Sequence, residues 1–248
     1  MISESGLTLT FGSSSIPYTI VRSSRKTLGI SVEPSGQVIV KAPSHTDLET
    51  IQTKVHQKRH WIAKKVQEFS KIKEPSPKMQ EPVNGEKIHY KNKLYRLKIH
   101  LIEENTPFVR LIARYMHIYI PSSTSEEDKG TVIKQVLIQW YKEKCGKYIR
   151  DRIQKHQKLF AIKPKEIEIR DLQQRWGSCT NNRKLIFNWK IIMAPISAID
   201  YVLLHELCHL VEPDHSLEFW SLLESVMPSY KHWKEWLLIN GLNLQLRW

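Results

Sequence analysis

Residues 205–209 read HELCH, an HExxH motif with two histidines four positions apart and a glutamate after the first. On a helix, residues four apart lie on one face, so both imidazoles can point at one metal ion while Glu206 projects beside them. Zinc suits imidazole ligands, and a catalytic zinc site uses three protein ligands and a water. We therefore predict His205 and His209 as metal ligands and Glu206 as the general base that takes a proton from the water.

The HExxH motif alone can arise by chance, but the residues around it support a metal site. Ser197 can cap a helix, and residues 198–211 are apolar except for Asp200 and the motif itself. A helix that is apolar nearly all round is buried. Burying two histidines and a glutamate is costly unless something satisfies them, and a bound metal would do so.

The third ligand has several candidates downstream of the motif. His215 follows His209 by six residues, after a turn that contains Pro213. We favour His215 because it opens the next predicted helix where the chain must return past the metal. A carboxylate would instead give the His₂Glu type of zinc site. The carboxylate candidates are Glu212, Asp214, Glu218 and Glu224.

The elements around the motif favour an α+β fold. Alternation of apolar and polar residues predicts strands near 18–24, 28–43, 87–104, 108–121, 167–172 and 184–195, with a tight turn at 34–36 and an antiparallel meander over 87–121. Helices are expected from Ser44 to about residue 72, from 125 to 160 with a kink at Gly146, and at 197–211, 215–226 and 229–239. Strands first and helices last are typical of α+β proteins.

Three regions are expected along the chain. Residues 1–17 read as a flexible tail, 18–120 as a β-rich basic N-terminal region, and 121–248 as the catalytic domain. Residues 73–86 contain three prolines and a glycine, so they are the best linker within the basic region.

The formal net charge is +13, and most of the excess lies in residues 1–120. This favours a polyanionic partner such as nucleotide or nucleic acid, although a solvated surface explains it equally well. The apolar runs are too short to span a bilayer, and the N-terminus lacks a signal-peptide pattern, so we expect a cytoplasmic protein without membrane contact. The three cysteines form no CxxC pair and are expected to be reduced and buried.

Five sequence blocks together resemble one family. They are RWGSCT at 175–180, LIFNWKIIMAP at 185–195, YVLLHELCHL at 201–210, HSLEFW at 215–220 and MPSYKHWKEWL at 227–237. In order and spacing they are similar to the YgjP-like metallopeptidases, minimal zincins related to SprT-type and WLM-type proteases. The resemblance implies a zincin-like domain whose HExxH helix packs on a small mixed sheet. It also implies one zinc ion at His205, His209 and His215, with Glu206 in the catalytic role.

Further residues could contact the substrate or stabilise the transition state. Arg175, Trp176 and Ser178 belong to the RWGSC block, and Arg175 could stabilise an oxyanion or hold a phosphate. A purely structural role is the alternative: Trp176 would pack in the core, and Arg175 would pair with an acidic residue such as Asp171.

Two other features could shape the substrate site. Tyr230 and His232 could polarise the scissile group across the metal, although such residues more often simply pack. The strand at 184–192 is expected to form the edge of the cleft, to which an extended peptide adds as a further strand. Asp214 and Glu218 are possible carboxylates for orienting the histidines.

Three functions fit these features. The leading one is a zinc metallopeptidase acting on protein or peptide. The second is hydrolysis of a phosphoanhydride in a nucleoside triphosphate by the same site, which the positive charge would favour. The third is a DNA-associated protease, because SprT-type relatives cut proteins attached to DNA and the basic N-terminal half could deliver the enzyme there.

Overall fold

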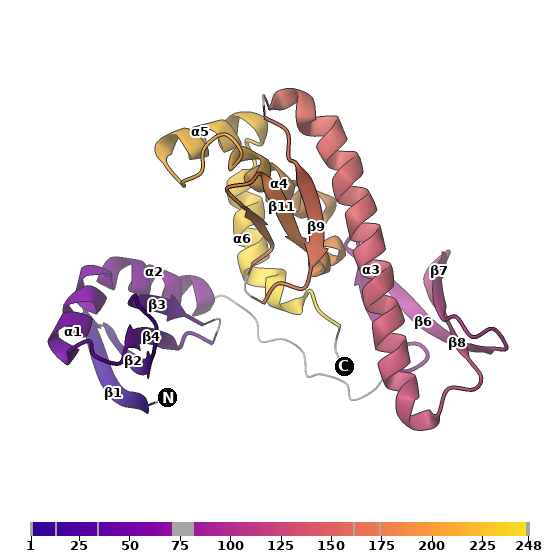
Figure 1. Cartoon of the computed structure of the whole chain (residues 1–248), viewed down its shortest axis with the longest axis horizontal. Helices are drawn as coiled ribbons and strands as arrows, with labels where there is room; N and C mark the ends of the chain where they lie inside the picture. Colours follow the sequence, from indigo (N-terminus) through magenta and orange to yellow (C-terminus); the bar gives the residue numbers. More distant parts are fainter. Residues whose placement is uncertain are drawn as a thin grey trace. The chain divides into compact units, whose positions relative to one another are not determined.

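The computed structural model of the chain describes residues 2–12, 14–33, 35–70, 82–160, 162–173 and 175–246 (Figure 1). Contacts divide the chain into two compact units, residues 1–74 and 75–248. This division falls in the predicted linker, of which residues 73–81 lie outside the described residues. The boundary expected at residue 120 is wrong, because Leu97 and Ile118 share one hydrophobic core with Leu204 of the HExxH helix.

The first unit contains a four-stranded sheet. Its strands are β1 (Ile2–Phe11), β2 (Ser14–Ser23), β3 (Gly29–Val32) and β4 (Val38–Pro43), in the spatial order β1-β2-β4-β3. Because β1 pairs antiparallel with β2, most of the expected flexible tail at 1–17 is strand instead. The predicted turn at 34–36 falls between β3 and β4, where Gly36 has a φ of 83° that suits glycine.

Two helices follow this sheet in place of the single helix predicted from Ser44. They are α1 (Leu48–Gln57) and α2 (Arg59–Ser70). Asp47 caps α1, since its carboxylate accepts a hydrogen bond from the Thr50 N–H at 2.7 Å. The helix is interrupted at Lys58. Ile51, Val55 and Ile62 of these helices are buried in the core of this unit.

The second unit begins with a sheet of the same topology. Its strands are β5 (Lys87–Tyr90), β6 (Lys93–Ile102), β7 (Phe108–Ile112) and β8 (Tyr115–Pro121), in the order β5-β6-β8-β7. In both sheets the second and fourth strands are parallel, and the first and third pair antiparallel with them. The antiparallel meander predicted over 87–121 is therefore a mixed sheet.

The long predicted helix is α3 (Glu126–His156), followed by a 3₁₀ turn, η1 (Gln157–Leu159). Three acidic residues in its first turn suit the positive end of the helix dipole. The helix continues without a break through Gly146, where an interruption was expected. A Cβ added at Gly146 would lie 3.4 Å from the Ile169 side chain, so the glycine lets a strand pack closely on the helix.

A three-stranded mixed sheet lies beside the second half of α3 (Figure 1). Its strands are β9 (Glu166–Arg170), β10 (Gly177–Cys179) and β11 (Lys184–Asn188), in the order β10-β11-β9. β11 is parallel to β9 and antiparallel to β10. The strand predicted at 184–195 ends at Asn188, because a 3₁₀ helix, η2 (Trp189–Met193), follows.

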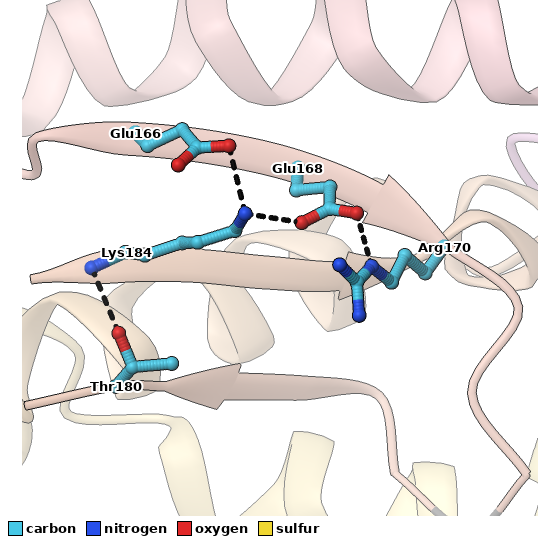
Figure 2. Close-up of polar contacts among 5 residues, drawn as sticks. All are labelled: Glu166, Glu168, Arg170, Thr180 and Lys184. Carbon is cyan, nitrogen blue, oxygen red and sulfur yellow. Dashed lines mark hydrogen bonds and ion pairs between the residues drawn. The ribbon is translucent and has the colours of Figure 1, made fainter. Parts of the chain in front are cut away.

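Charged side chains connect β9 with β11, and Thr180, just after β10, contacts the start of β11 (Figure 2). The Lys184 ammonium lies 2.8 Å from a Glu166 carboxylate oxygen and 2.6 Å from one of Glu168, which also pairs with Arg170. The main-chain N–H of Lys184 donates to the Thr180 hydroxyl at 3.2 Å. These contacts fix the register of β11 against β9 on one side and the end of β10 on the other.

The C-terminal helices are α4 (Ile196–Cys208), α5 (Leu217–Val226) and α6 (Tyr230–Asn240), and a short 3₁₀ helix, η3 (Gly241–Asn243), follows α6. α4 carries the HExxH motif and contacts β10, α5 and α6. Helices and mixed sheets together confirm the predicted α+β class. Within the described part of the chain, we find no helix whose length and hydropathy would allow it to cross a membrane.

An ion pair joins α3 to α4 and predicts a stability effect. Arg152 pairs with both oxygens of Asp200, side chains that are 23% and 11% exposed. Arg152→Ala should lower the free energy of unfolding by about 2 kcal/mol, because it leaves a largely buried carboxylate unpaired. Lys147→Ala, which breaks the exposed Lys147–Asp151 pair, should change it by less than about 0.5 kcal/mol. Urea unfolding followed by tryptophan fluorescence compares the two, and equal losses would contradict this reasoning.

Candidate metal centre

α4 and the segment after it bring His205, His209 and His215 together. One ring nitrogen from each lies within 4.8 Å of the others, and the Nε2 atoms of His205 and His215 are 3.0 Å apart. Zinc–nitrogen bonds of about 2.0–2.1 Å in a tetrahedral site place two ligand nitrogens about 3.3 Å apart. The observed spacing is therefore close to what one shared ion requires.

The protonation of these imidazoles also suits a metal. Burial lowers the pKa of His205 to about 3, with further lowering by the neighbouring His209 and His215. Burial and His209 likewise lower the pKa of His215. Neutral imidazoles are the form that binds metal. Two neutral rings can satisfy each other at this contact only if one Nε2 carries the proton, whereas a cation held between them would take both Nε2 lone pairs.

The rings are held from behind by contacts that leave nitrogen atoms available. The Nδ1 atom of His209 lies 3.1 Å from the main-chain carbonyl oxygen of Glu212, so donation there leaves Nε2 free. The ring of Phe219, which is fully buried, lies 4.4–4.9 Å from all three histidine rings. Trp220 stacks on His215 at 5.4 Å. Both aromatic residues come from the first turn of α5, which explains the spacing of the HSLEFW block.

The carboxylates considered as third ligands lie outside this group. Among the described residues, the cluster consists of the three histidines alone. Glu212 contributes its main-chain carbonyl, and Glu224 pairs with Lys231 at 3.0 Å. A carbonyl therefore orients His209, where Asp214 or Glu218 had been considered.

Glu206 lies beside the cluster and is 5% exposed. Its carboxylate lies against Gly177 of β10, where an added Cβ would be 2.6 Å from Oε1. Burial raises the pKa of Glu206 to about 8, and the positive charge of Arg175 opposes this rise. Near neutral pH, Glu206 can therefore both hold and release a proton.

A cleft of about 690 Å³ opens over these residues. Arg175, Trp176 and Ser178 line it, as expected of substrate contacts, and Asp171 pairs with Lys190 instead of Arg175. Trp176 also packs on the hydrophobic core, as its structural role would require.

Tyr230 and His232 are not among the residues that line the cleft. Tyr230 is buried, with its ring stacked 5.6 Å from that of Trp220, so it supports His215 from behind. His232 is exposed and packs on Trp233 at 4.7 Å. The role suggested for these two residues across the metal is therefore corrected to packing, because α6 presents them away from the cleft.

The strand that borders the cleft is also different from the one expected. β11, at 184–188, is the central strand and pairs on both sides. β10 is the edge strand of this sheet on the cleft side, and its residues Gly177, Ser178 and Cys179 line the cleft. An edge strand offers unpaired N–H and C=O groups, so β10 is where an extended chain can add.

Two residues with evident roles were not singled out from the sequence. Tyr201 lines the cleft with its ring 5.8 Å from that of His205, and burial raises the pKa of its hydroxyl. Its position one turn before His205, on the same helix face, was the available signal. Asn188 is buried and donates to the carbonyls of Leu172 at 2.7 Å and Arg175 at 3.1 Å, so it fixes the loop that carries Arg175.

The three cysteines are free. Burial raises the pKa of Cys145 and Cys208 to about 12 and that of Cys179 to about 11. All three are thus thiols at neutral pH, in line with the expectation of reduced cysteines, although Cys179 also lines the cleft. A thiolate nucleophile is therefore not favoured here.

Comparison with known proteins gives one match. A family model described as "YgjP-like, metallopeptidase domain" matches residues 26–240, a range that includes every residue lining the cleft. Among curated proteins and among solved structures, no match was found.

Proposed function

Because the chain belongs to the YgjP-like metallopeptidase family, we propose that it is a zinc peptidase whose ion is held by His205, His209 and His215. Family membership makes it a metal-dependent hydrolase of the peptidase type, acting on protein or peptide. One observation supports the three-histidine zinc site with Glu206 beside it. Three imidazoles converge in a cleft beside a buried glutamate, Glu206.

Each residue of the site has a separate role in the proposed hydrolysis of a peptide bond. A zinc ion held by the three histidines would supply a Lewis acid that lowers the pKa of a bound water to about 7. Glu206 accepts a proton from the attacking water and returns it to the leaving amine. The Tyr201 hydroxyl, which its raised pKa keeps protonated, and the Arg175 guanidinium are the cleft donors for the developing oxyanion.

The exposed edge of β10 supports an extended peptide as substrate. A chain added there would be bound mainly through its backbone, with little sequence selectivity. Gly177 and Ser178 of this edge both line the cleft, beside the histidines and Glu206.

A second candidate is favoured by the charge of the cleft. Arg175 and Arg183 both line it, and arginine pairs well with phosphate oxygens. The same general base could therefore direct water at a phosphoanhydride of a nucleoside triphosphate.

One experiment separates the two candidates. Zinc-loaded protein is incubated with casein and, separately, with nucleoside triphosphates, before and after chelation and zinc readdition. We expect casein fragments that disappear with chelator and return with zinc. Release of phosphate or pyrophosphate with the same metal dependence, and no casein cleavage, would reject the peptidase and favour the alternative.

Metal binding should release a proton from Glu206. The pKa of about 8 without a cation falls when a cation binds nearby, because a positive charge favours the carboxylate. At a pH between the values without and with the cation, Glu206 is protonated in the metal-free protein and ionised in the zinc-bound protein. Zinc affinity should therefore rise with pH and level off above about 8. Calorimetry at pH 7 in buffers of different ionisation enthalpy should find about one proton more for wild type than for Glu206→Gln. Equal proton release would contradict the assignment.

Gly177→Ala should impair catalysis without removing the metal. The new Cβ would displace the Glu206 carboxylate, and a shift of about 1 Å in a catalytic group can cost about 100-fold in rate. Gly130→Ala is the matched control, because its Cβ meets nothing closer than 3.7 Å. Peptidase rates and bound zinc are measured for both variants, and an unimpaired Gly177→Ala would place Glu206 elsewhere during catalysis.

A further inference from the structure

The β5-β6-β8-β7 sheet has one face in the core and one open face. Leu97, Ile118 and Leu111 belong to the core side, where α3 packs. The strand register places the side chains of the opposite side in three cross-strand rows. We call these nine residues the open face: Arg96, Tyr115 and Ile112; Lys98, His117 and Arg110; His100, Tyr119 and Phe108.

Aromatic rings form a column across the open face. Phe108 and Tyr119 stack with ring centroids 4.5 Å apart and Tyr119 and His100 at 4.8 Å, with interplanar angles below 20°. His117 joins them through a contact of 2.9 Å between its Nδ1 and the Nε2 of His100. Such a column can be extended by another flat ring.

Cations lie among these rings. The Arg110 guanidinium is 5.1 Å from the Phe108 ring, and the Lys98 ammonium is 4.1 Å from that of Tyr115. The open face contains no carboxylate, and no acid in the described part of the chain forms an ion pair with Arg96, Lys98 or Arg110. Its charge is therefore uniformly positive and available to an anion.

The fold itself does not require this composition. The β1-β2-β4-β3 sheet has the same topology, and its corresponding face carries Thr19 and Val21 on β2, Ser31 on β3, and Ile39 and Lys41 on β4. These positions hold one cation and no aromatic ring. The aromatic and cationic residues of the second sheet are therefore not a consequence of the shared topology.

A pocket of about 550 Å³ adjoins the open face where the edge strand β7 meets α3. Arg110 and Ile112 line the pocket and also belong to the open face, so the two are continuous. The other aromatic and cationic residues of the pocket are Tyr90, Trp140, Tyr148, Lys91, Lys144 and Lys147.

The charge of the pocket is also positive. Its acidic residue, Asp151, pairs with Lys147 at 3.2 Å, and the Lys91 ammonium lies 4.4 Å from the Tyr148 ring. The remaining cations face a hollow with aromatic walls, a combination suited to a flat ring that carries a phosphate.

We propose that the pocket and the open face together bind single-stranded nucleic acid. Aromatic side chains stack on unpaired bases, and interspersed lysines and arginines neutralise the phosphates, which is the chemistry of non-specific single-strand binding. A duplex would leave the aromatic column unused, because its bases are already stacked on one another. An acidic peptide would match the charge but not the rings. No residue of this surface lines the metal-site cleft, so the binding is separate from the proposed peptidase chemistry.

The test measures binding of the full-length, zinc-loaded protein to fluorescent 20-nucleotide strands of U and of dT by anisotropy. Affinity should fall steeply between about 50 and 200 mM salt, as counterion release requires. Lys98→Gln combined with Arg110→Gln should weaken binding at least tenfold and reduce the salt slope by about 1.4, since each phosphate contact on a single strand contributes about 0.7.

Two further variants separate stacking from charge. Tyr119→Leu keeps the charge and the apolar packing, so it should weaken binding about tenfold while leaving the salt slope unchanged. The charge-matched control is Lys163→Gln with Lys165→Gln, two exposed lysines just before β9, which should bind within twofold of wild type. Thermal unfolding midpoints check that every variant is folded.

Several outcomes would overturn the proposal. One is that the protein does not bind the strands at low salt. Another is that the control pair loses as much affinity as Lys98→Gln with Arg110→Gln, which would mean that binding depends on net charge alone. A 20-base-pair duplex bound as tightly as the single strands would reject single-strand recognition. Poly-glutamate bound as tightly as nucleic acid would indicate an acidic protein partner instead. Binding of U alone or of dT alone would support the proposal and identify the strand as RNA or DNA.

Discussion

Glu206→Gln is expected to lower kcat for peptide hydrolysis by about 10³-fold while leaving KM and bound zinc near their wild-type values. The amide matches the carboxylate in shape, so the side chain can keep its buried place against Gly177. It cannot accept a proton, however, and general-base catalysis contributes about 10²–10⁴-fold in rate. The metal should remain because Glu206 is outside the ligand group.

Glu212→Gln is the control for this substitution. Glu212 is also a glutamate near the histidines, but its contact with His209 is made by the main chain, which the substitution preserves. Its kcat should stay within about twofold of wild type. A Glu206→Gln protein that keeps a tenth or more of the wild-type kcat with zinc bound would contradict the general-base role.

Local sequence was sufficient to predict the helix that carries the motif. The apolar run around Asp200 predicted a buried helix, and the structure buries ten residues of α4. The same reasoning identified Asp200 as a polar residue within this apolar run, but it could not identify the residue that forms an ion pair with it. Arg152 lies 48 residues earlier on α3, and nothing local in the sequence pairs the two.

The wall of the cleft could not be predicted in the same way. β10 is three residues long, GSC, and has no alternation of apolar and polar residues to mark it as a strand. It exists because β11 pairs with it and Glu206 packs against Gly177, both of which are tertiary contacts. The sequence therefore predicted the strand at 184–192 as the edge of the cleft, whereas the edge is β10.

Predictions for the C-terminal aromatic residues failed for a related reason. Helical spacing located α6 to within a residue but not its orientation, which packing against α4 sets. Tyr230 consequently faces Trp220, whereas Tyr201, on the motif helix itself, lies beside His205.

The boundary between the units was misplaced because composition changes little across residue 120. Residues 87–121 are as basic and strand-rich as the first unit, and the two sheets share a topology. Only the packing of Leu97, Met116 and Ile118 against α3 and the core around α4 assigns the second sheet to the catalytic unit.

His215→Ala is expected to reduce zinc affinity by more than about 100-fold. Replacing a group that merely orients a ligand costs about 10–100-fold, so removing a ligand should cost more. The substitution leaves only His205 and His209, and two imidazoles alone make an incomplete site for zinc. Zinc bound per chain, titrated against a competing chelator, measures this directly.

His232→Ala provides the matched control, because this exposed histidine packs on Trp233 and does not line the cleft. It should bind one zinc with unchanged affinity. His215→Ala should remain folded, since His215 is exposed and the Phe219 and Trp220 side chains that support it stay packed on the core. Unfolding midpoints with and without zinc then separate loss of metal from loss of fold, because only a protein that binds zinc is stabilised by it. If the variant keeps one tightly bound zinc, a carboxylate must replace the imidazole, and Glu212, Asp214, Glu218 and Glu224 become the residues to substitute next.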